Sequence, residues 1–510
     1  MIQETPLKRI AQGTFILFIG IFLSKLLGYG YRVLIARNGV EEYGIFSLAL
    51  AVYGLVLAFA SLGLPEGIAR YVGFFRGENE VGKMRKSLAM SLKILLFTGL
   101  ISMIILFFLA KPLALKIFKT QELTLVLQII LIAIPFDMAI RVFVNTLRGM
   151  EMPKYEVYIR NLTENIIKIA LTATFFVLGI KLVGMTIAFV AATIVSFILL
   201  GLTLNKKFPI FKKIEEYPGL RRELLVYSLP LFMSNVMIFV FTWVDTLMIG
   251  WLMNPHDVGL YNAAVPTSQL LYLFPSTLMA MFLPIMTMIY AQKHPDMFKQ
   301  VYQAATRWIW IINLAFVLPL LIFAKPILSI LFGNVYGAAT LALIVLLVGR
   351  FIDFGLLAGS NVLMVVKRTK LLLFNNLVAA ALNVILNLIF IPRYGIVGAA
   401  LGTSIAVSVQ AVMVLIETKV LTQTFALTKN SLKILLSGFI AGSILYLASD
   451  YFTPTLIMII IQSLFFLAVY LFLLYVTKAF QREDLEIVLQ IEEKMGIDLK
   501  HVKKILRKFR

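Results

Sequence analysis

Apolar stretches of about 20 or more residues recur along the whole chain, and each is long enough to cross a bilayer as a helix. With 60% hydrophobic residues and a mean hydropathy of +0.93, the 510-residue chain has the composition of a polytopic membrane protein. We therefore predict an all-α integral membrane protein with fourteen transmembrane helices, at residues 10–36, 43–68, 87–110, 121–147, 157–180, 182–204, 224–252, 258–290, 305–330, 336–365, 371–392, 395–418, 432–449 and 453–477.

The basic residues are unevenly distributed between the loops. The formal net charge is +21, and most Lys and Arg residues outside the spans lie in the two ends and the even-numbered loops. The positive-inside rule then places both termini in the cytoplasm of a multi-pass protein of the cell membrane. The positive charge is explained by orientation and by attraction to anionic headgroups, so we expect no nucleic-acid partner.

The spans show an internal duplication. Four sets of similar residues recur in the same order, separated by 214 to 219 positions: Gly44 with Gly259, Leu64-Pro65 with Leu283-Pro284, Asp137 with Asp353, and Leu182-Val183-Gly184 with Ile396-Val397-Gly398. Each repeat contains six spans, and an even number makes the two lobes parallel, with a central cavity between them as the usual consequence.

The remaining segments complete the predicted organisation. Two helices follow the duplication, and the last residues have the spacing of an amphipathic basic helix on the inner leaflet. The predicted parts are an N-terminal six-helix lobe (1–204), a cytoplasmic basic linker (205–223), a C-terminal six-helix lobe (224–418), helices 13 and 14 (419–480) and a cytoplasmic amphipathic basic tail (481–510).

Two basic residues lie inside the first span. A cation at the bilayer centre costs about 3 kcal/mol, so such residues normally face a bundle interior or a water-filled cavity. Lys25 and Arg32 are seven residues apart, almost two helical turns, and therefore share one face. We interpret them as part of a positively charged lining, with local pairing or extension of Lys25 toward the interface as the alternative.

Three further basic residues extend this candidate anion site: Arg70 at the end of the second span, Arg141 in the fourth and Arg160 in the fifth. A structural role is the alternative for two of them. Arg141 lies four residues after Asp137, and Arg160 belongs to a ladder of alternating charge, so both can be neutralised along one helix face. That ladder consists of Glu156, Arg160, Glu164 and Lys168.

Three carboxylates are candidates for ion coupling or gating, namely Asp245, Glu66 and Asp353. Asp245 has no basic residue within one turn of its own helix, so binding H⁺ or Na⁺ would relieve the cost of its burial. The alternative for Asp245 is an ion pair across the cavity with a residue such as Arg32. Asp353 follows Arg350 by three residues, and we expect the two to pair.

The sequence contains few features of an enzyme. Cysteine is absent, which excludes disulfides and thiolate chemistry, and the three histidines have no neighbours at ligand spacing. There is no GxxxxGK[ST] string for ATP hydrolysis. We therefore expect a transporter without metal or cofactor, and keep a membrane glycosyltransferase or polymerase as the alternative from another class.

Three stretches carry recognisable motifs: Leu64–Gly67 with Arg70 at the end of the second span, Trp243–Gly250 with Val258–Ala264 at the seventh and eighth, and Asn376–Thr403 with Asn383 and Asn387 at the eleventh and twelfth. They resemble signatures of the polysaccharide flippases, a family of the multidrug/oligosaccharidyl-lipid/polysaccharide exporter superfamily. The resemblance covers all fourteen spans. It implies a V-shaped pair of lobes whose cationic cavity opens to one side of the membrane at a time, and a groove for a polyprenyl tail beside the last two helices.

The resemblance and the intramembrane cations together predict a flippase, functional as a monomer. It would move a polyprenyl phosphate- or pyrophosphate-linked oligosaccharide from the inner to the outer leaflet by alternating access. Lys25, Arg32, Arg70, Arg141 and Arg160 would hold the headgroup while the tail stays among membrane lipids. A cation-coupled multidrug exporter of the same superfamily and a peptidoglycan-precursor flippase are the closest alternatives.

Overall fold

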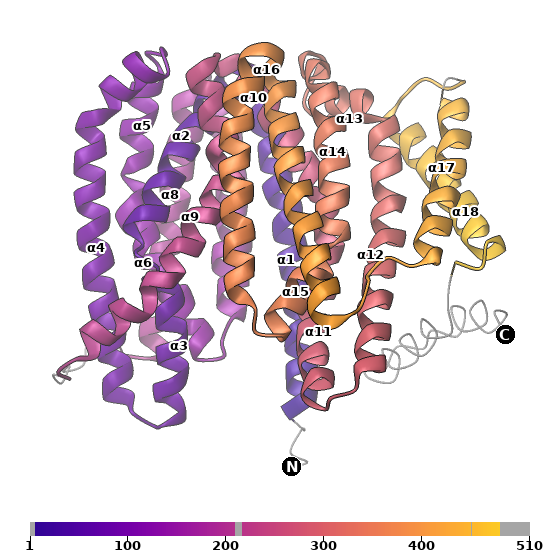
Figure 1. The fold of residues 1–510 in the computed structure, drawn as a ribbon. Helices are drawn as coiled ribbons and strands as arrows, with labels where there is room; N and C mark the ends of the chain where they lie inside the picture. The colour runs from indigo at the N-terminus through magenta and orange to yellow at the C-terminus, as the bar shows by residue number, and fades with distance from the viewer. Residues whose placement is uncertain (1–5, 210–216, 450, 480–510) are drawn as a thin grey trace. The chain divides into compact units, whose positions relative to one another are not determined.

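The structure is a computed structural model that describes residues 6–209, 217–449 and 451–479. Within these ranges the chain is helical and contains no strand. Its contacts divide it into two compact units, Met1–Ala263 and Ala264–Arg510 (Figure 1).

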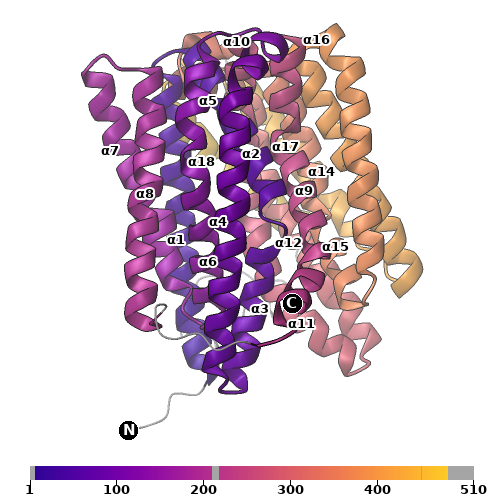
Figure 2. The same cartoon turned by 90° about the vertical axis from the view of Figure 1, so that its left-hand side faces the viewer.

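The first unit contains the helices up to the middle of α10. Its segments are α1 (Pro6–Ala36), α2 (Val40–Ala60), α3 (Leu64–Gly77), α4 (Val81–Pro112), the π-helix η1 (Leu113–Ile117), α5 (Leu123–Leu131), α6 (Ala133–Gly149), the π-helix η2 (Glu156–Thr163), α7 (Glu164–Val177), α8 (Leu182–Lys207), α9 (Leu220–Leu252) and the start of α10 (Pro255–Ser268). Figure 2 shows α7 and α8 side by side at one edge of this unit.

The second unit contains the remaining helices. They are the 3₁₀-helix η3 (Gln269–Tyr272), α11 (Leu273–Ala291), α12 (Pro295–Ile322), α13 (Ala324–Leu331), the 3₁₀-helix η4 (Asn334–Ala339), α14 (Thr340–Gly355), α15 (Leu357–Val365), α16 (Thr369–Thr422), α17 (Lys429–Ser449) and α18 (Leu456–Val476). Among its packed pairs, α14 contacts α16 and α12 contacts α17.

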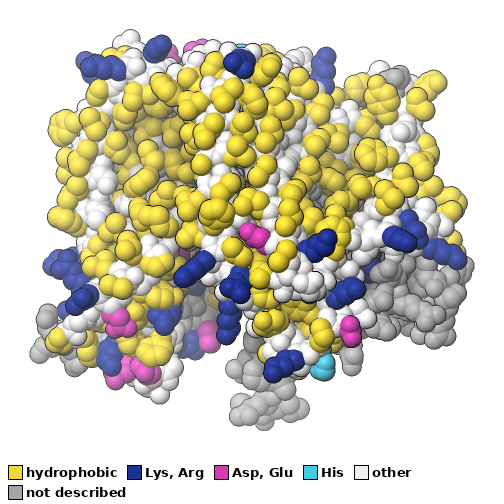
Figure 3. All heavy atoms as spheres, viewed as in Figure 1, with side chains coloured by type: hydrophobic (Ala, Val, Ile, Leu, Met, Phe, Trp, Pro, Cys, Tyr) yellow, Lys and Arg dark blue, Asp and Glu magenta, His cyan; other side chains and the backbone are white. Residues whose placement is uncertain are grey.

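Each of the fourteen predicted spans coincides with a helical segment among the described residues. Eleven of these segments are long and apolar enough to cross a membrane by length and composition, and one of them, α16, contains two predicted spans. In Figure 3, hydrophobic side chains cover most of the visible face of each unit. The predicted all-helical, multi-pass membrane fold is therefore confirmed.

The predicted lobe and linker boundaries stay predictions. In the structure α9, the seventh span, packs against α2 and α3 within the first unit. Residues 210–216 of the predicted linker and the predicted amphipathic tail, 481–510, lie outside the described residues.

The second span ends earlier than its hydropathy predicts, and a separate helix follows it. Helix α2 ends at Ala60, and α3 begins at Leu64. Gly63 between them has φ +68°, which glycine adopts without the steric cost paid by other residues, and Pro65 in the first turn of α3 requires no backbone donor. Glu66 and Arg70 therefore lie on α3, a separate helix, rather than in the second span.

The eleventh and twelfth spans form two antiparallel arms within α16. Gly395 separates them with φ 59° and ψ −137°. Amide side chains join the arms: Asn375 Nδ2 donates to Glu417 Oε2 at 2.7 Å, and Asn383 Nδ2 donates to Thr403 Oγ1 at 3.0 Å. Hydrogen bonds of this kind are a usual role of amide side chains between apolar helices.

The reversal at Gly395 gives a direct test of backbone strain. We expect Gly395→Ala to destabilise the protein by about 1–3 kcal/mol, because an L-residue pays this cost in such a conformation. The measurement is the thermal unfolding midpoint of the purified protein in detergent. Gly28→Ala is the control, since a Cβ there meets no atom within 4 Å. Equal midpoints for the two variants would contradict the prediction.

Candidate functional site

Five charged side chains gather in the first unit on α6, η2 and α7. We call Asp137, Arg141, Arg160, Glu164 and Lys168 the charge cluster. Arg160 is central: its Nη2 lies 2.5 Å from Asp137 Oδ1 and its Nη1 lies 3.0 Å from Glu164 Oε2. Arg141 Nε lies 3.4 Å from Asp137 Oδ2, and Lys168 Nζ lies 2.6 Å from Glu164 Oε1. The ion pairs thus form one continuous network.

The two carboxylates of the charge cluster are almost inaccessible. The side chain of Asp137 is 1% exposed and that of Glu164 is 3% exposed, whereas Arg141 and Arg160 are 35% and 27% exposed. Buried charges are tolerated when each has a partner and its hydrogen bonds are made. With three cations and two carboxylates, the ionised cluster retains one net positive charge.

Local sequence explains part of this geometry. Arg141 follows Asp137 by one helical turn, and Arg160, Glu164 and Lys168 follow one another at the same spacing, so the pairing expected from the ladder is confirmed for these residues. Arg160 lies in the π-helical segment η2, a feature that often marks functional sites.

Glu156 lies outside the charge cluster, although the ladder included it. Its carboxylate instead accepts two hydrogen bonds from Arg148, at 2.7 Å from Nε and 2.6 Å from Nη2. The Arg148 side chain is 51% exposed, so this is a surface pair.

Lys25 and Arg32 lie on α1, which packs against η2 and α7. Asn165 of α7 approaches Ser24, with Nδ2 3.5 Å from Oγ, so the segment of α1 that carries Lys25 lies beside the helices of the charge cluster. Lys25 is exposed and Arg32 is half-buried. Neither forms an ion pair with a carboxylate in the described ranges.

Arg70 and Glu66 have partners of their own, where α3 meets α9. The Arg70 guanidinium carbon is 4.3 Å from the centroid of the Tyr227 ring and 5.4 Å from that of Tyr71, a cation–π arrangement. Glu66 Oε2 accepts a hydrogen bond from Asn235 Nδ2 at 3.1 Å. These partners of the two predicted residues therefore differ from those of Arg141 and Arg160.

The other two candidate carboxylates have near partners. Asp245 Oδ2 accepts a hydrogen bond of 2.6 Å from the hydroxyl of Tyr261. In the second unit, Arg350 Nη1 lies 3.3 Å from Asp353 Oδ2, as their spacing predicts. Within the described part of the chain, no three His, Asp or Glu side chains gather closely enough to hold a metal ion.

Sequence reasoning missed three polar partners: Tyr227, Asn235 and Tyr261. Each comes from a different helix than the charged residue it contacts. Of the three, only Asn235 could have been recognised from the sequence, because an amide inside a long apolar stretch normally forms an interhelical hydrogen bond.

Two family models match the chain. The one described as polysaccharide biosynthesis protein matches residues 10–290, more than half of the chain. The one described as MatE matches residues 230–389.

The chain is also similar to archaeal membrane proteins. It is 24% identical over 417 residues to the uncharacterized membrane protein MJ1068 of Methanocaldococcus jannaschii, covering 76% of this chain and 79% of the relative. It is 23% identical over 192 residues to the probable low-salt glycan biosynthesis flippase Agl15 of Haloferax volcanii, covering 38% of this chain and 41% of the relative.

A solved structure supports the fold. The inward-facing conformation of a multidrug resistance MATE family transporter of the MOP superfamily matches with a TM-score of 0.69. The match covers 78% of this chain and 94% of that chain at 16% sequence identity. At this identity the likeness concerns the fold.

Proposed function

Because this chain belongs to the polysaccharide biosynthesis protein family of the multidrug/oligosaccharidyl-lipid/polysaccharide exporter superfamily, we propose that it is a flippase for a lipid-linked oligosaccharide. It would move a sugar headgroup, joined to a polyprenyl chain by phosphate or pyrophosphate, from the inner to the outer leaflet by alternating access. The polyprenyl tail would stay among the membrane lipids.

The observation that carries the proposal is the excess of positive charge in the helices of the first unit. Lys25 and Arg32 form no ion pair with a described carboxylate, and α1 packs against η2 and α7, which carry Arg160 and Lys168. A phosphate-linked sugar carries negative charge on its phosphates. Arg binds phosphate bidentately and Lys supplies a point charge, so these side chains suit such a headgroup.

The roles of the candidate residues differ within this proposal. Lys25 and Arg32 would contact the phosphate directly. Arg141 and Arg160 are already paired with carboxylates, so they would contribute mainly the single net positive charge of the charge cluster. Arg70, held over the Tyr227 ring, would meet the headgroup only in another conformational state.

Three carboxylates would serve coupling or gating. Asp245, with its Tyr261 hydrogen bond, is the candidate for H⁺ or Na⁺. Glu66 accepts a hydrogen bond from Asn235 of α9, and Asp353 pairs with Arg350 of its own helix. Release of Asn235 from Glu66 would separate α3 from α9 at that point.

A cation-coupled multidrug exporter is the second candidate, since the MatE model matches residues 230–389 and the matched solved structure is a multidrug transporter. Cationic drugs require a site with excess negative charge. The net positive charge of the charge cluster therefore favours the flippase.

A reconstitution experiment separates the two. We expect proteoliposomes to translocate a fluorescent polyprenyl-pyrophosphate oligosaccharide at least about tenfold faster than protein-free vesicles, because two charge-assisted hydrogen bonds to phosphate supply several kcal/mol. Accessibility of the sugar to a lectin outside the vesicles measures translocation.

Two further measurements serve as controls. The same sugar on an uncharged polyprenol should move no faster than in protein-free vesicles, and an organic cation should not accumulate under an imposed Na⁺ or H⁺ gradient. Accumulation of the cation without translocation of the glycolipid would establish the exporter instead.

A further inference from the structure

A basic pocket lies in the second unit, and none of the candidate site residues lines it. It occupies about 570 Å³, within the range typical of ligand sites, and is lined by Lys367, Arg368, Thr369, Lys370, Leu371 and Leu421. The first five come from the turn between α15 and α16 and the first residues of α16, and Leu421 comes from the end of its second arm. The pocket therefore depends on the hairpin at Gly395, which brings Leu421 close to Leu371, 50 positions earlier in the chain.

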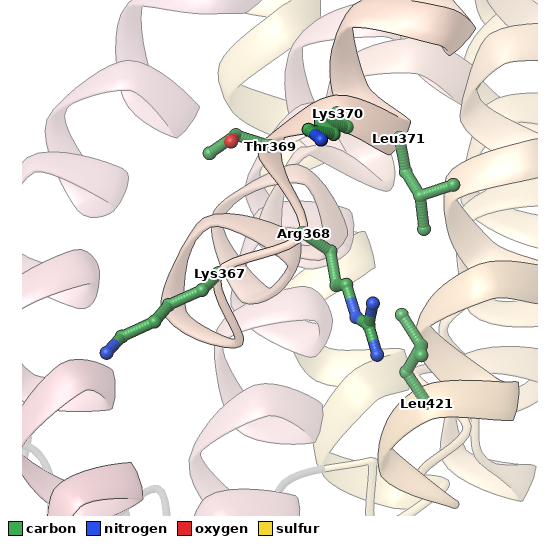
Figure 4. A pocket seen from close by; sticks show the side chains of 6 residues that line it. All are labelled: Lys367, Arg368, Thr369, Lys370, Leu371 and Leu421. Carbon is green, nitrogen blue, oxygen red and sulfur yellow. The ribbon is translucent and has the colours of Figure 1, made fainter.

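Its three cations are not neutralised by any carboxylate that the structure describes. Lys367, Arg368 and Lys370 are exposed, and none forms an ion pair with a carboxylate of the described ranges. Glu417, one turn before Leu421, instead accepts a hydrogen bond of 2.7 Å from Asn375. Figure 4 shows the Arg368 side chain extending toward Leu421, whereas Lys367 extends in the opposite direction.

The apolar wall of the pocket continues into the outer surface of α16. Beside Leu371, Phe374 is 56% exposed, and beside Leu421, Val420 is 64% exposed. In a membrane protein, exposed side chains of this kind face lipid tails. The pocket therefore joins a cationic end to a surface suited to an acyl chain, at the side of the membrane predicted to be cytoplasmic.

We propose that this pocket binds the phosphate headgroup of an anionic phospholipid of the inner leaflet. Arg368 would take the phosphate oxygens, Lys370 and Lys367 would add charge at the rim, and an acyl chain would pack along Leu371 and Leu421. The phosphate group could also belong to a free anion, but a free anion would make no use of the apolar wall. This inference does not depend on the transported substrate.

The test measures lipid binding to the full-length protein in neutral detergent by native mass spectrometry. Phosphatidylglycerol should bind more tightly than phosphatidylcholine. Arg368→Gln should weaken phosphatidylglycerol binding about fivefold, since each basic residue near the headgroup contributes about that factor, and the triple substitution of Lys367, Arg368 and Lys370 by Gln should weaken it about 100-fold. Phosphatidylcholine binding should be the same in every variant.

Arg393→Gln is the matched control, because Arg393 is an exposed arginine at the opposite end of the same arm of α16. It should leave phosphatidylglycerol binding unchanged. An equal loss in Arg393→Gln and Arg368→Gln would overturn the proposal, because the effect would then be general charge attraction.

Excess inorganic phosphate separates the two sources of the anion. It should fail to displace phosphatidylglycerol from the wild-type protein. Full displacement would show that the pocket takes free anions and would overturn the lipid assignment. Unfolding midpoints measured without added lipid verify that each variant is folded, and Arg368→Lys, which keeps the charge, should retain most of the binding.

Discussion

The Asp137→Asn substitution should destabilise the protein by about 3–5 kcal/mol, the largest loss that we expect from a single uncharged replacement. Asp137 is 1% exposed and lies within ion-pair distance of both Arg160 and Arg141. Its removal leaves two arginines facing each other with only Glu164 to compensate them. The measurement is the yield of monodisperse protein and its unfolding midpoint in detergent.

A double-mutant cycle assigns this loss to the ion pair. Arg160→Gln removes the cation that Asp137 holds, so the double variant should be less destabilised than the sum of the two single variants. Glu156→Gln is the matched control, because its Arg148 partner is 51% exposed and surface pairs contribute about 1 kcal/mol or less. Additive losses in the cycle would contradict the network described here.

Replacing Lys25 and Arg32 together by Gln should slow translocation of the phosphate-linked glycolipid at least about 100-fold. Each cation would contribute a charge-assisted hydrogen bond of about 1.5–3 kcal/mol to the passing phosphate, and tenfold in rate corresponds to about 1.4 kcal/mol. Stability should change little, because neither side chain forms an ion pair in the described ranges. The lectin-accessibility assay in proteoliposomes measures the rate, and the unfolding midpoint measures stability.

Two comparisons make this result specific. Lys93→Gln removes an exposed lysine from α4, another span of the first unit, and should leave translocation unchanged. The charge-preserving pair Lys25→Arg and Arg32→Lys should keep most of the activity. Normal translocation by the Gln double variant would reject the role of α1 in headgroup binding.

The two predictions distinguish structural from functional cations. Arg160 contacts two buried carboxylates, so removing its partners should affect folding. Lys25 and Arg32 lack such partners among the described carboxylates, so removing them should affect transport. The contacts of a basic side chain inside a span thus decide whether it stabilises the fold or serves transport. The hydropathy of the span does not reveal those contacts.

The spans were predictable from the sequence because membrane insertion depends on local composition. A helix needs about 20 apolar residues to cross the bilayer, and this requirement is visible in any window of the chain. Ion pairs within one helix were predictable for the same reason. The four-residue spacing of Asp137 and Arg141, and the three-residue spacing of Arg350 and Asp353, already place each pair within reach.

The motifs were also sufficient to identify the family, since they are short strings of neighbouring residues.

Positions where helices bend were harder to predict. The break at Gly63 and the reversal at Gly395 require a backbone conformation that hydropathy does not record, although Pro65 and the Pro392–Gly395 region carried local signals. The displacement of Glu66 and Arg70 onto α3 followed from the first of these breaks.

What the sequence by itself determined is therefore the helical membrane fold, its spans and the contacts within single helices. The tertiary structure decided which charges are neutralised: Arg160 contacts Asp137 of another helix, Asn235 contacts Glu66 at a separation of 169 residues, and Leu421 closes the pocket beside Arg368. Such contacts depend on how helices pack, and packing is set jointly by many side chains. No local pattern contains that information.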